Sequence, residues 1–426
     1  MSKSHDDQNF CTMNDEISGV DADDSHLAPP RLSTVTLTSP DADDSHLAPP
    51  PLPTLQLDLV EEILCRLSVK LLCQLRCICK SWNSLISDPK FAKKHLCHST
   101  TRRIHFLSCS TRRIRSCVNH PPNNLLTSYP LDSLFTNEVT TNVTQLEYPS
   151  NNYDYLNYIL RGSCNGILCL ADYHEGSILL CNPSLRKFKK LTPFQMPLVI
   201  SHIQTSYGFG YDHVNDNYKV VIILNYYIGV TLEIKTEVQV YTFSTNCWRN
   251  IGEFPFDGVP AELSGKFVGG TIYWLACKDQ GTRKSPCFIV SFDLENESFQ
   301  EVPKPDYGNV DENFVNLGVL RDCLCLICGH DIWLMKECQN KESWIKLFTV
   351  SYMRDPSKSY VLDKAIYSFE DDQVLLECRG DWGLRLIVYD PKINTFKFTK
   401  FQNKSVYNSI YHGPHVSVES LILPWS

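Results

Sequence analysis

Apolar residues recur at helical spacing in one short part of the chain, residues 55–97. Within 58–67, five of them lie three or four positions apart and therefore share one face of a predicted helix: Leu59, Val60, Ile63, Leu64 and Leu67. Ser68 then offers an oxygen that can cap a second helix, which runs through Val69 to Leu75. The pattern predicts a small helical domain.

Two more short helices are expected before the end of this region. The third has residues recurring at steps of three or four, namely Cys79, Trp82, Asn83 and Ile86. Asp88 followed by Pro89 favours the start of a fourth, because Asp caps a helix and Pro fits its first turn. Three to four short helices have more apolar faces than they can cover among themselves, which indicates that a partner covers part of the surface.

From residue 98 to 426 the helical period gives way to short β-branched and aromatic runs, separated by Gly, Asn, Asp and Pro. A hairpin pattern repeats along this region: a strand residue, a polar turn, and an aromatic residue seven positions later. The pairs are Cys181 and Phe188, Tyr241 and Trp248, Phe292 and Phe299, and Tyr389 and Phe396. Met335 and Trp344 form a variant with two extra residues.

The aromatic members of these pairs recur at intervals of 45 to 60 residues. A period near 50 with about four strands per repeat is typical of β-propeller blades. We therefore predict an all-β propeller of about six blades over 98–426. The β-patterned segments 104–107 and 416–423 lie at opposite ends of this region, and we expect them to pair and close the ring.

Composition separates a third region, residues 1–54. It contains the same ten residues twice, at 21–30 and 41–50, and holds ten acidic residues against two basic ones. A segment so rich in Asp and Pro cannot bury enough apolar surface to fold, so we predict a disordered acidic leader. The alternative is a recognition motif presented twice.

Residues 55–426 hold 38 basic and 38 acidic residues. A balanced body gives little long-range attraction to nucleic acid or to an anionic membrane, so neither is expected as a partner. The sequence has no apolar run of membrane-spanning length, and we expect neither a membrane span nor a cleavable secretory signal. Its nineteen cysteines fit reduced thiols, and we expect a cytoplasmic and/or nuclear protein.

Several longer motifs in the chain resemble those of a known family. The segment 55–96 resembles an F-box, through Asp58-Leu-Val-Glu-Glu-Ile-Leu-Cys-Arg-Leu and Leu75-Arg-Cys-Ile-Cys-Lys-Ser-Trp-Asn-Ser-Leu-Ile-Ser-Asp-Pro-Lys-Phe. Downstream, Gly162-Ser-Cys-Asn-Gly-Ile-Leu-Cys-Leu, Cys181-Asn-Pro-Ser-Leu-Arg-Lys and Tyr207-Gly-Phe-Gly-Tyr-Asp resemble the F-box-associated domain of the plant F-box and kelch-type family. The resemblance covers nearly all of the chain after residue 54.

The resemblance implies the substrate-recognition subunit of a Skp–cullin–F-box ubiquitin ligase. The F-box would dock on the Skp-type adaptor, and through it on cullin, while the propeller holds an unknown client protein. The chain itself would perform no catalysis and need no cofactor or metal. The implied adaptor-binding residues are Leu55, Leu59, Val60, Ile63, Leu64, Leu67, Val69, Leu75 and Trp82. For each one alone, the core of the helical domain is the competing interpretation.

The chain departs from the family pattern at two positions. Gln56 and Ser68 stand where the family usually has proline. Proline restricts the unfolded chain, so each loss predicts a looser F-box, by about 0.4–1 kcal/mol. The alternative function is therefore a propeller scaffold with a weakened F-box and no ligase role.

Other candidate sites have weaker support. Cys325 and Cys328, with Cys323 nearby, form a CxxC without the second ligand pair that zinc needs, so buried thiols are favoured. His412 and His415 flank a Gly-Pro turn without a third ligand. The basic residues Arg102, Arg103, Arg112, Arg113 and Arg115 are interpreted as a solvated hairpin face rather than a nuclear-import or nucleic-acid site. A propeller enzyme would need a convergent cluster of ionisable residues, and no catalytic motif appears.

Overall fold

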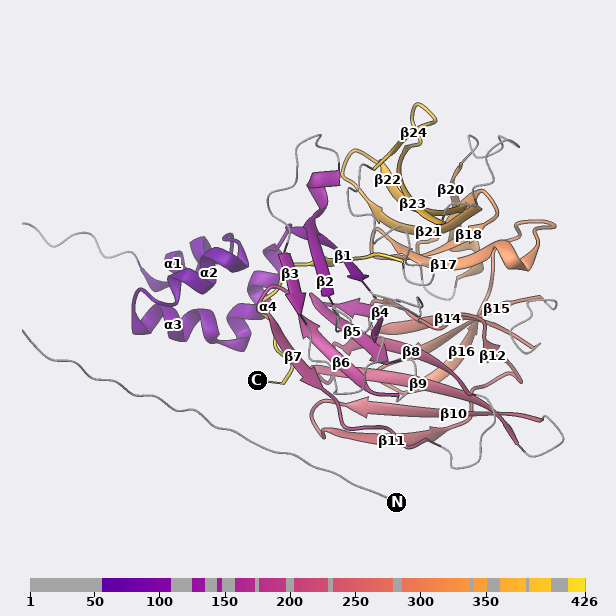
Figure 1. Cartoon of the computed structure of the whole chain (residues 1–426), viewed down its shortest axis with the longest axis horizontal. Helices are drawn as coiled ribbons and strands as arrows, with labels where there is room; N and C mark the ends of the chain where they lie inside the picture. The colour runs from indigo at the N-terminus through magenta and orange to yellow at the C-terminus, as the bar shows by residue number, and fades with distance from the viewer. Residues whose placement is uncertain are drawn as a thin grey trace, which may run out of the picture. The chain divides into compact units, whose positions relative to one another are not determined.

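The computed structural model describes residues 56–108, 125–134, 144–147, 158–172, 176–196, 203–228, 233–278, 286–337, 340–350, 361–380, 383–399 and 413–425. The predicted leader, Leu55, Arg112, Arg113, Arg115 and His412 lie outside these residues. Four short helices come first (Figure 1): α1 Leu57–Leu64, α2 Val69–Leu75, α3 Lys80–Ser87 and α4 Pro89–His98. The predicted small helical domain is confirmed.

Side-chain caps mark the starts of α2 and α4. The Ser68 hydroxyl accepts a hydrogen bond from the Leu71 backbone N–H at 3.4 Å, and the Asp88 carboxylate accepts one from the Lys90 N–H at 2.7 Å. Both residues have extended backbone angles, as N-caps do. The first helix is shorter than the predicted 58–67, because the chain turns after Leu64.

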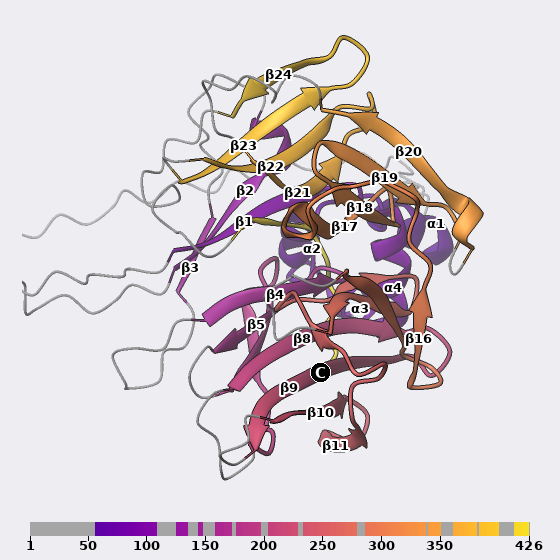
Figure 2. The same ribbon diagram turned by 90° about the vertical axis from the view of Figure 1, so that its right-hand side faces the viewer.

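Six antiparallel sheets follow, and Figure 2 shows them arranged around a common axis. Blade 1 combines β25 His415–Val418, β1 Arg102–Ser108, β2 Leu125–Pro130 and β3 Thr144–Glu147. Blade 2 contains β4 Tyr158–Cys164, β5 Ile167–Asp172, β6 Ile178–Asn182 and β7 Lys187–Lys190. Blade 3 contains β8 Ile203–Asp212, β9 Asn217–Ile228, β10 Glu233–Thr242 and β11 Cys247–Gly252.

Blade 4 has a divided inner strand. Its β12 Val259–Pro260 and β13 Lys266–Val268 both pair with β14 Thr271–Cys277, which is followed by β15 Phe288–Asp293 and β16 Ser298–Val302. Blade 5 contains β17 Val315–Leu320, β18 Cys323–Cys328, β19 Asp331–Met335 and β20 Trp344–Thr349. Blade 6 contains β21 Val361–Ser368, β22 Val374–Gly380, β23 Gly383–Asp390 and β24 Thr395–Phe398. The prediction of about six blades is confirmed.

The repeated hairpin places each predicted pair directly opposite in a strand ladder. The registers are Cys181 with Phe188, Tyr241 with Trp248, Phe292 with Phe299, Met335 with Trp344, and Tyr389 with Phe396. In the four seven-residue repeats, the residue two positions before the aromatic has a positive φ: Arg186, Asn246, Glu297 and Asn394. The same turn therefore joins the two outer strands of four blades.

The ring closes between the first and last strands of the propeller. Ile104 of β1 pairs with Val416 of β25, so one blade is built from both ends of the region, as predicted. Asn182 of blade 2 then holds the chain that follows β25, donating from its amide to the carbonyls of Ser420 at 2.9 Å and Ile422 at 2.8 Å. Such closure covers the edge of β1 that would otherwise be unpaired.

The helical domain contacts the propeller through α4 and the chain that follows it. Phe91 and Ala92 belong to the same buried apolar cluster as residues of blades 2 and 3. The Lys93 ammonium pairs with Asp216 in the β8–β9 turn. The Ser99 hydroxyl donates to the Glu419 carbonyl at 3.0 Å, just after β25.

Candidate functional site: an apolar surface on the helical domain

Exposed apolar side chains concentrate on the helical domain. Among the described residues, thirteen large hydrophobic side chains are more than a third exposed, and five of them lie in the short segment before residue 79. These five are Leu57, Leu59, Ile63, Leu71 and Ile78, and we call them the apolar surface. Isolated exposed hydrophobic residues are ordinary, whereas a concentration in so small a domain marks an interaction site.

Helix α1 supplies a neighbouring pair of this surface. Leu59 and Ile63 are one helical turn apart, so they lie side by side, and they are 52% and 51% exposed. The neighbouring polar side chains already have partners: Glu61 pairs with Lys94 of α4 at 2.8 Å, and Glu62 pairs with Arg66 at 2.9 Å. The hydrogen bond and charge of Arg66 lower the pKa of Glu62. The helix thus presents apolar side chains bordered by compensated charges.

The predicted adaptor-binding residues divide into three groups in the structure. Leu59 and Ile63 are exposed, and Val60, Leu67, Leu75 and Trp82 are half-buried. Leu64 and Val69 are each only 1% exposed and pack inside the helical domain. Those two side chains belong to the buried core. Leu55 lies outside the described residues.

Sequence reasoning missed three members of the apolar surface. Leu57 is 70% exposed at the first position of α1, Leu71 projects from α2, and Ile78 is 63% exposed between α2 and α3. Their positions outside the predicted core faces could have indicated that they are exposed. Ile78 follows the end of α2, and Leu71 is adjacent to the buried Leu72.

The two family prolines would fit the observed backbone. Gln56 has φ −59° and ψ 141°, and Ser68 has φ −65° and ψ 150°. Proline fixes φ near −65°, so neither position would need to move to accept it. Only Ser68 would lose a side-chain cap.

The structure also shows where the other candidate residues named from the sequence lie. Cys325 and Cys328 are buried in β18, where burial raises the pKa of the Cys328 thiol to about 12. Within the described residues no group of three or more Cys, His, Asp or Glu is arranged to hold a metal ion. The sequence predicted that Arg103 lies on a solvated face, and this prediction is wrong. The side chain is largely buried, and its guanidinium is 3.5 Å from the Glu419 carboxylate.

Comparison with known proteins agrees with this architecture. The family model of the F-box associated beta propeller domain matches residues 125–422, and that of the F-box domain matches 52–94. An F-box/kelch-repeat protein of Arabidopsis thaliana is 31% identical over 316 residues, which cover 71% of this chain and 80% of that protein. The F-box protein CPR1 of Arabidopsis thaliana is 28% identical over 392 residues, covering 86% and 88%.

An F-box joined to a propeller defines the class of substrate adaptors of Skp–cullin–F-box ligases, whose members are typically non-catalytic. This chain belongs to the family of F-box proteins with an F-box-associated β-propeller domain. In the part of the chain that the structure describes, no helix is long and apolar enough to cross a membrane.

Proposed function

We propose that this protein is the substrate-recognition subunit of a Skp–cullin–F-box ubiquitin ligase. The apolar surface docks on the Skp-type adaptor and through it on cullin, while the propeller binds the client protein. The concentration of exposed Leu and Ile side chains on α1, α2 and the α2–α3 connection supports this role. The chain performs no catalysis itself. Its many free cysteines suit a reducing compartment, the cytoplasm and/or the nucleus.

The residues proposed to contact the adaptor are those that the structure leaves accessible. They are Leu59 and Ile63 on α1, together with Leu57, Leu71 and Ile78. The half-buried Val60, Leu67, Leu75 and Trp82 support this surface and contribute their exposed edges. Leu64 and Val69 act indirectly, by holding the helices together.

Calorimetric titration of a purified plant Skp-type adaptor into the full chain tests this proposal. Ile63→Asp should abolish or strongly weaken binding, because a carboxylate on the contact would have to lose its water. The matched control is Ile393→Asp, since Ile393 is 68% exposed in the β23–β24 turn and is the same residue type. Equal adaptor binding by both variants would contradict the docking surface.

The scaffold alternative makes a different prediction in the same titration. The wild type would then fail to bind the adaptor, and Gln56→Pro, which restores the family residue, would fail as well. A wild type that fails while Gln56→Pro binds would assign the defect to the F-box start, and the ligase role of this chain would be rejected.

A further inference from the structure

The six blades surround a central channel with an unusual charge distribution. The cavity measures about 850 Å³ and is lined by the inner strands of all six blades. Among the described lining residues, six are basic and three are acidic. The basic ones are Arg102, Arg161, Lys266, Arg321, Lys364 and Arg379, and the acidic ones are Glu262, Asp322 and Asp363. Basic residues therefore exceed acidic ones here, although residues 55–426 are balanced as a whole.

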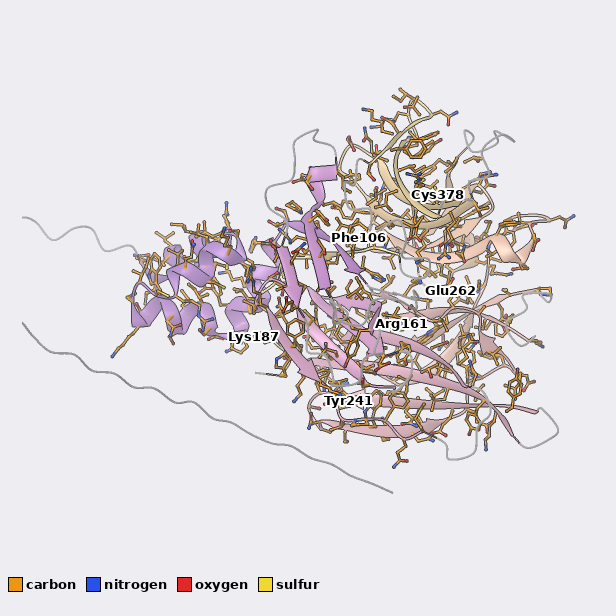
Figure 3. The ribbon with its side chains drawn as sticks, in the orientation of Figure 1. Phe106, Arg161, Lys187, Tyr241, Glu262 and Cys378 are labelled. Carbon is orange, nitrogen blue, oxygen red and sulfur yellow. The ribbon has the colours of Figure 1, made fainter. Side chains whose placement is uncertain are left out.

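Two of the three acidic groups are already engaged by protein donors. Glu262, labelled in Figure 3, lies between β12 and β13; it accepts the Leu317 backbone N–H at 3.0 Å and is 3.1 Å from Lys266. Asp363 is 2.7 Å from the Arg379 guanidinium. These pairs compensate Lys266 and Arg379, and Arg321 pairs with Asp372 at 2.8 Å, so part of the basic charge of the lining is balanced by fixed partners.

A further carboxyl group outside the lining, Glu377 of β22, lies beside Lys364. Its side chain is fully buried and lies 3.7 Å from the Lys364 ammonium. Burial raises the pKa of Glu377, and the neighbouring Asp363 raises it further, while Lys364 and Arg379 oppose the shift. Because burial dominates, the carboxyl is neutral over more of the pH range than an ordinary glutamate.

One imidazole, that of His415, lines the same cavity as Arg161, Lys266 and Lys364. His415 of β25 is enclosed by protein but keeps part of its surface open to the channel. Burial, followed by the charges of Lys364, Lys266, His105 and Arg161, lowers the pKa of His415 to about 3. These groups come from β21, β13, β1 and β4, in four different blades. Arg161, labelled in Figure 3, also lies over the Tyr207 ring, with 5.2 Å to its centroid.

We propose that the channel binds an anionic side chain of the client protein, a carboxylate or a phosphate, on Lys266, Lys364 and Arg161 beside His415. The inference rests on the proposed client-binding role of the propeller and adds the chemistry of the ligand. Charge-assisted hydrogen bonds from several converging cations are strong and favour oxygen anions. A nucleic acid is disfavoured because the basic groups lie inside the ring, while the body as a whole has no charge excess.

Fluorescence anisotropy with three labelled peptides of one length tests this inference. One peptide carries glutamates, one carries phosphoserines at the same positions, and one carries glutamines. We expect at least one of the anionic peptides to bind and the glutamine peptide not to bind. If both anionic peptides bind, negative charge alone determines binding. If only one binds, the result shows whether the channel recognises a carboxylate or a phosphate.

Variants locate the binding in the channel. Lys364→Gln should weaken anionic peptide binding by about tenfold, the range expected for a lost hydrogen bond to a charged group, and Lys364→Arg should retain most of it. The control is Lys187→Gln, because Lys187 is exposed on the outer strand β7 (Figure 3). Melting temperatures show whether Lys364→Gln still folds. If it does not, the wild-type NMR signal of His415, assigned with His415→Gln, gives the second readout: a bound anion should raise its pKa.

Several results would overturn the inference. These are equal binding of the anionic and glutamine peptides, equal effects of Lys364→Gln and Lys187→Gln, or a His415 signal that no anionic peptide changes. Displacement of the peptide by a short single-stranded RNA at equal concentration would indicate a nucleic-acid site instead. Adaptor titration of the same preparations separates the two proposals: adaptor binding without peptide binding rejects this inference alone, and the reverse rejects the ligase role.

Discussion

Gln56 precedes α1 with backbone angles that a proline would adopt unchanged. Gln56→Pro should therefore stabilise the fold by about 0.4–1 kcal/mol, because it restricts the unfolded chain without straining the folded one. A more rigid helix start should also tighten adaptor binding by at most about fivefold, since less freedom is lost on docking. Urea denaturation and adaptor titration measure the two effects.

Ser68→Pro is the matched control for that variant. The backbone angles are equally suitable, but this change removes the hydroxyl that caps α2. Loss of a cap costs about 1 kcal/mol, which offsets the gain from proline. We expect Gln56→Pro to be the more stable of the two. A Gln56→Pro protein less stable than wild type would contradict the observed backbone at residue 56.

The buried Glu377 carboxyl should give stability an unusual pH dependence. Its pKa is raised in the folded state, chiefly by burial, from an ordinary value of 4.5. Above that ordinary value the folded protein binds a proton that the unfolded chain releases, so this group's contribution to stability falls as the pH rises. Glu377→Gln cannot ionise, so its stability relative to wild type should increase between pH 4.5 and the raised pKa.

Denaturation of both proteins at a series of pH values measures this difference. Glu370→Gln is a suitable control, because Glu370 is exposed in the β21–β22 turn. A wild type that gains stability over Glu377→Gln as the pH rises would show that Glu377 is ionised and stabilised by Lys364.

In the F-box, the sequence predicts the helix caps but not which apolar residues are buried. The cap residues Ser68 and Asp88 were predictable, because capping depends on neighbouring backbone groups. The burial of Leu64 and Val69 beside the exposed Leu59 and Leu71 was not. Each short helix has apolar residues on more than one side, and only the packing of the helices decides which side is covered.

Among the structural elements, β25 completes blade 1 and the ring. It pairs with β1, and the chain after it is held by Asn182. Deleting 416–423 should expose the edge of β1, remove the buried Leu421 and Ile422, and cause aggregation. Light scattering and thermal denaturation measure this. A truncated protein that stays monomeric with an unchanged melting temperature would contradict closure by β25.

A milder variant tests the same closure without removing chain. Asn182→Ala leaves the Ser420 and Ile422 carbonyls without that amide donor, and unsatisfied buried groups cost about 1–3 kcal/mol each. The matched control is Asn309→Ala, at an exposed position between β16 and β17. Equal stability of the two variants would show that Asn182 does not hold the closing segment.

The hairpins were the most predictable elements, because strand, turn and aromatic residue all lie within about ten residues of sequence. The positive φ in these turns could not be predicted at Arg186 and Glu297, because Arg and Glu rarely adopt it. Asn246 and Asn394 are of a residue type that does signal a positive φ. The divided inner strand of blade 4 was also hidden. It depends on backbone hydrogen bonds between Tyr207 and the segment 263–265, which belong to neighbouring blades.

At the scale of the whole molecule, the two proposed binding sites use different parts of the chain. The apolar surface belongs to residues 57–78, whereas the basic channel is built by inner strands from across the propeller. The apolar surface could be predicted in part from the sequence, because its residues lie in one short segment. The channel could not be, because Arg161, Lys266, Lys364 and His415 are brought together only by closure of the ring.

The most direct test of the receptor role is the mass of the assembled complex. The full chain, the Skp-type adaptor and cullin should elute together, and light scattering should give one copy of each. Without the adaptor, or with Ile63→Asp, cullin and the chain should elute separately. A chain that elutes alone in the complete mixture, or that retains cullin when the adaptor is omitted, would contradict the account.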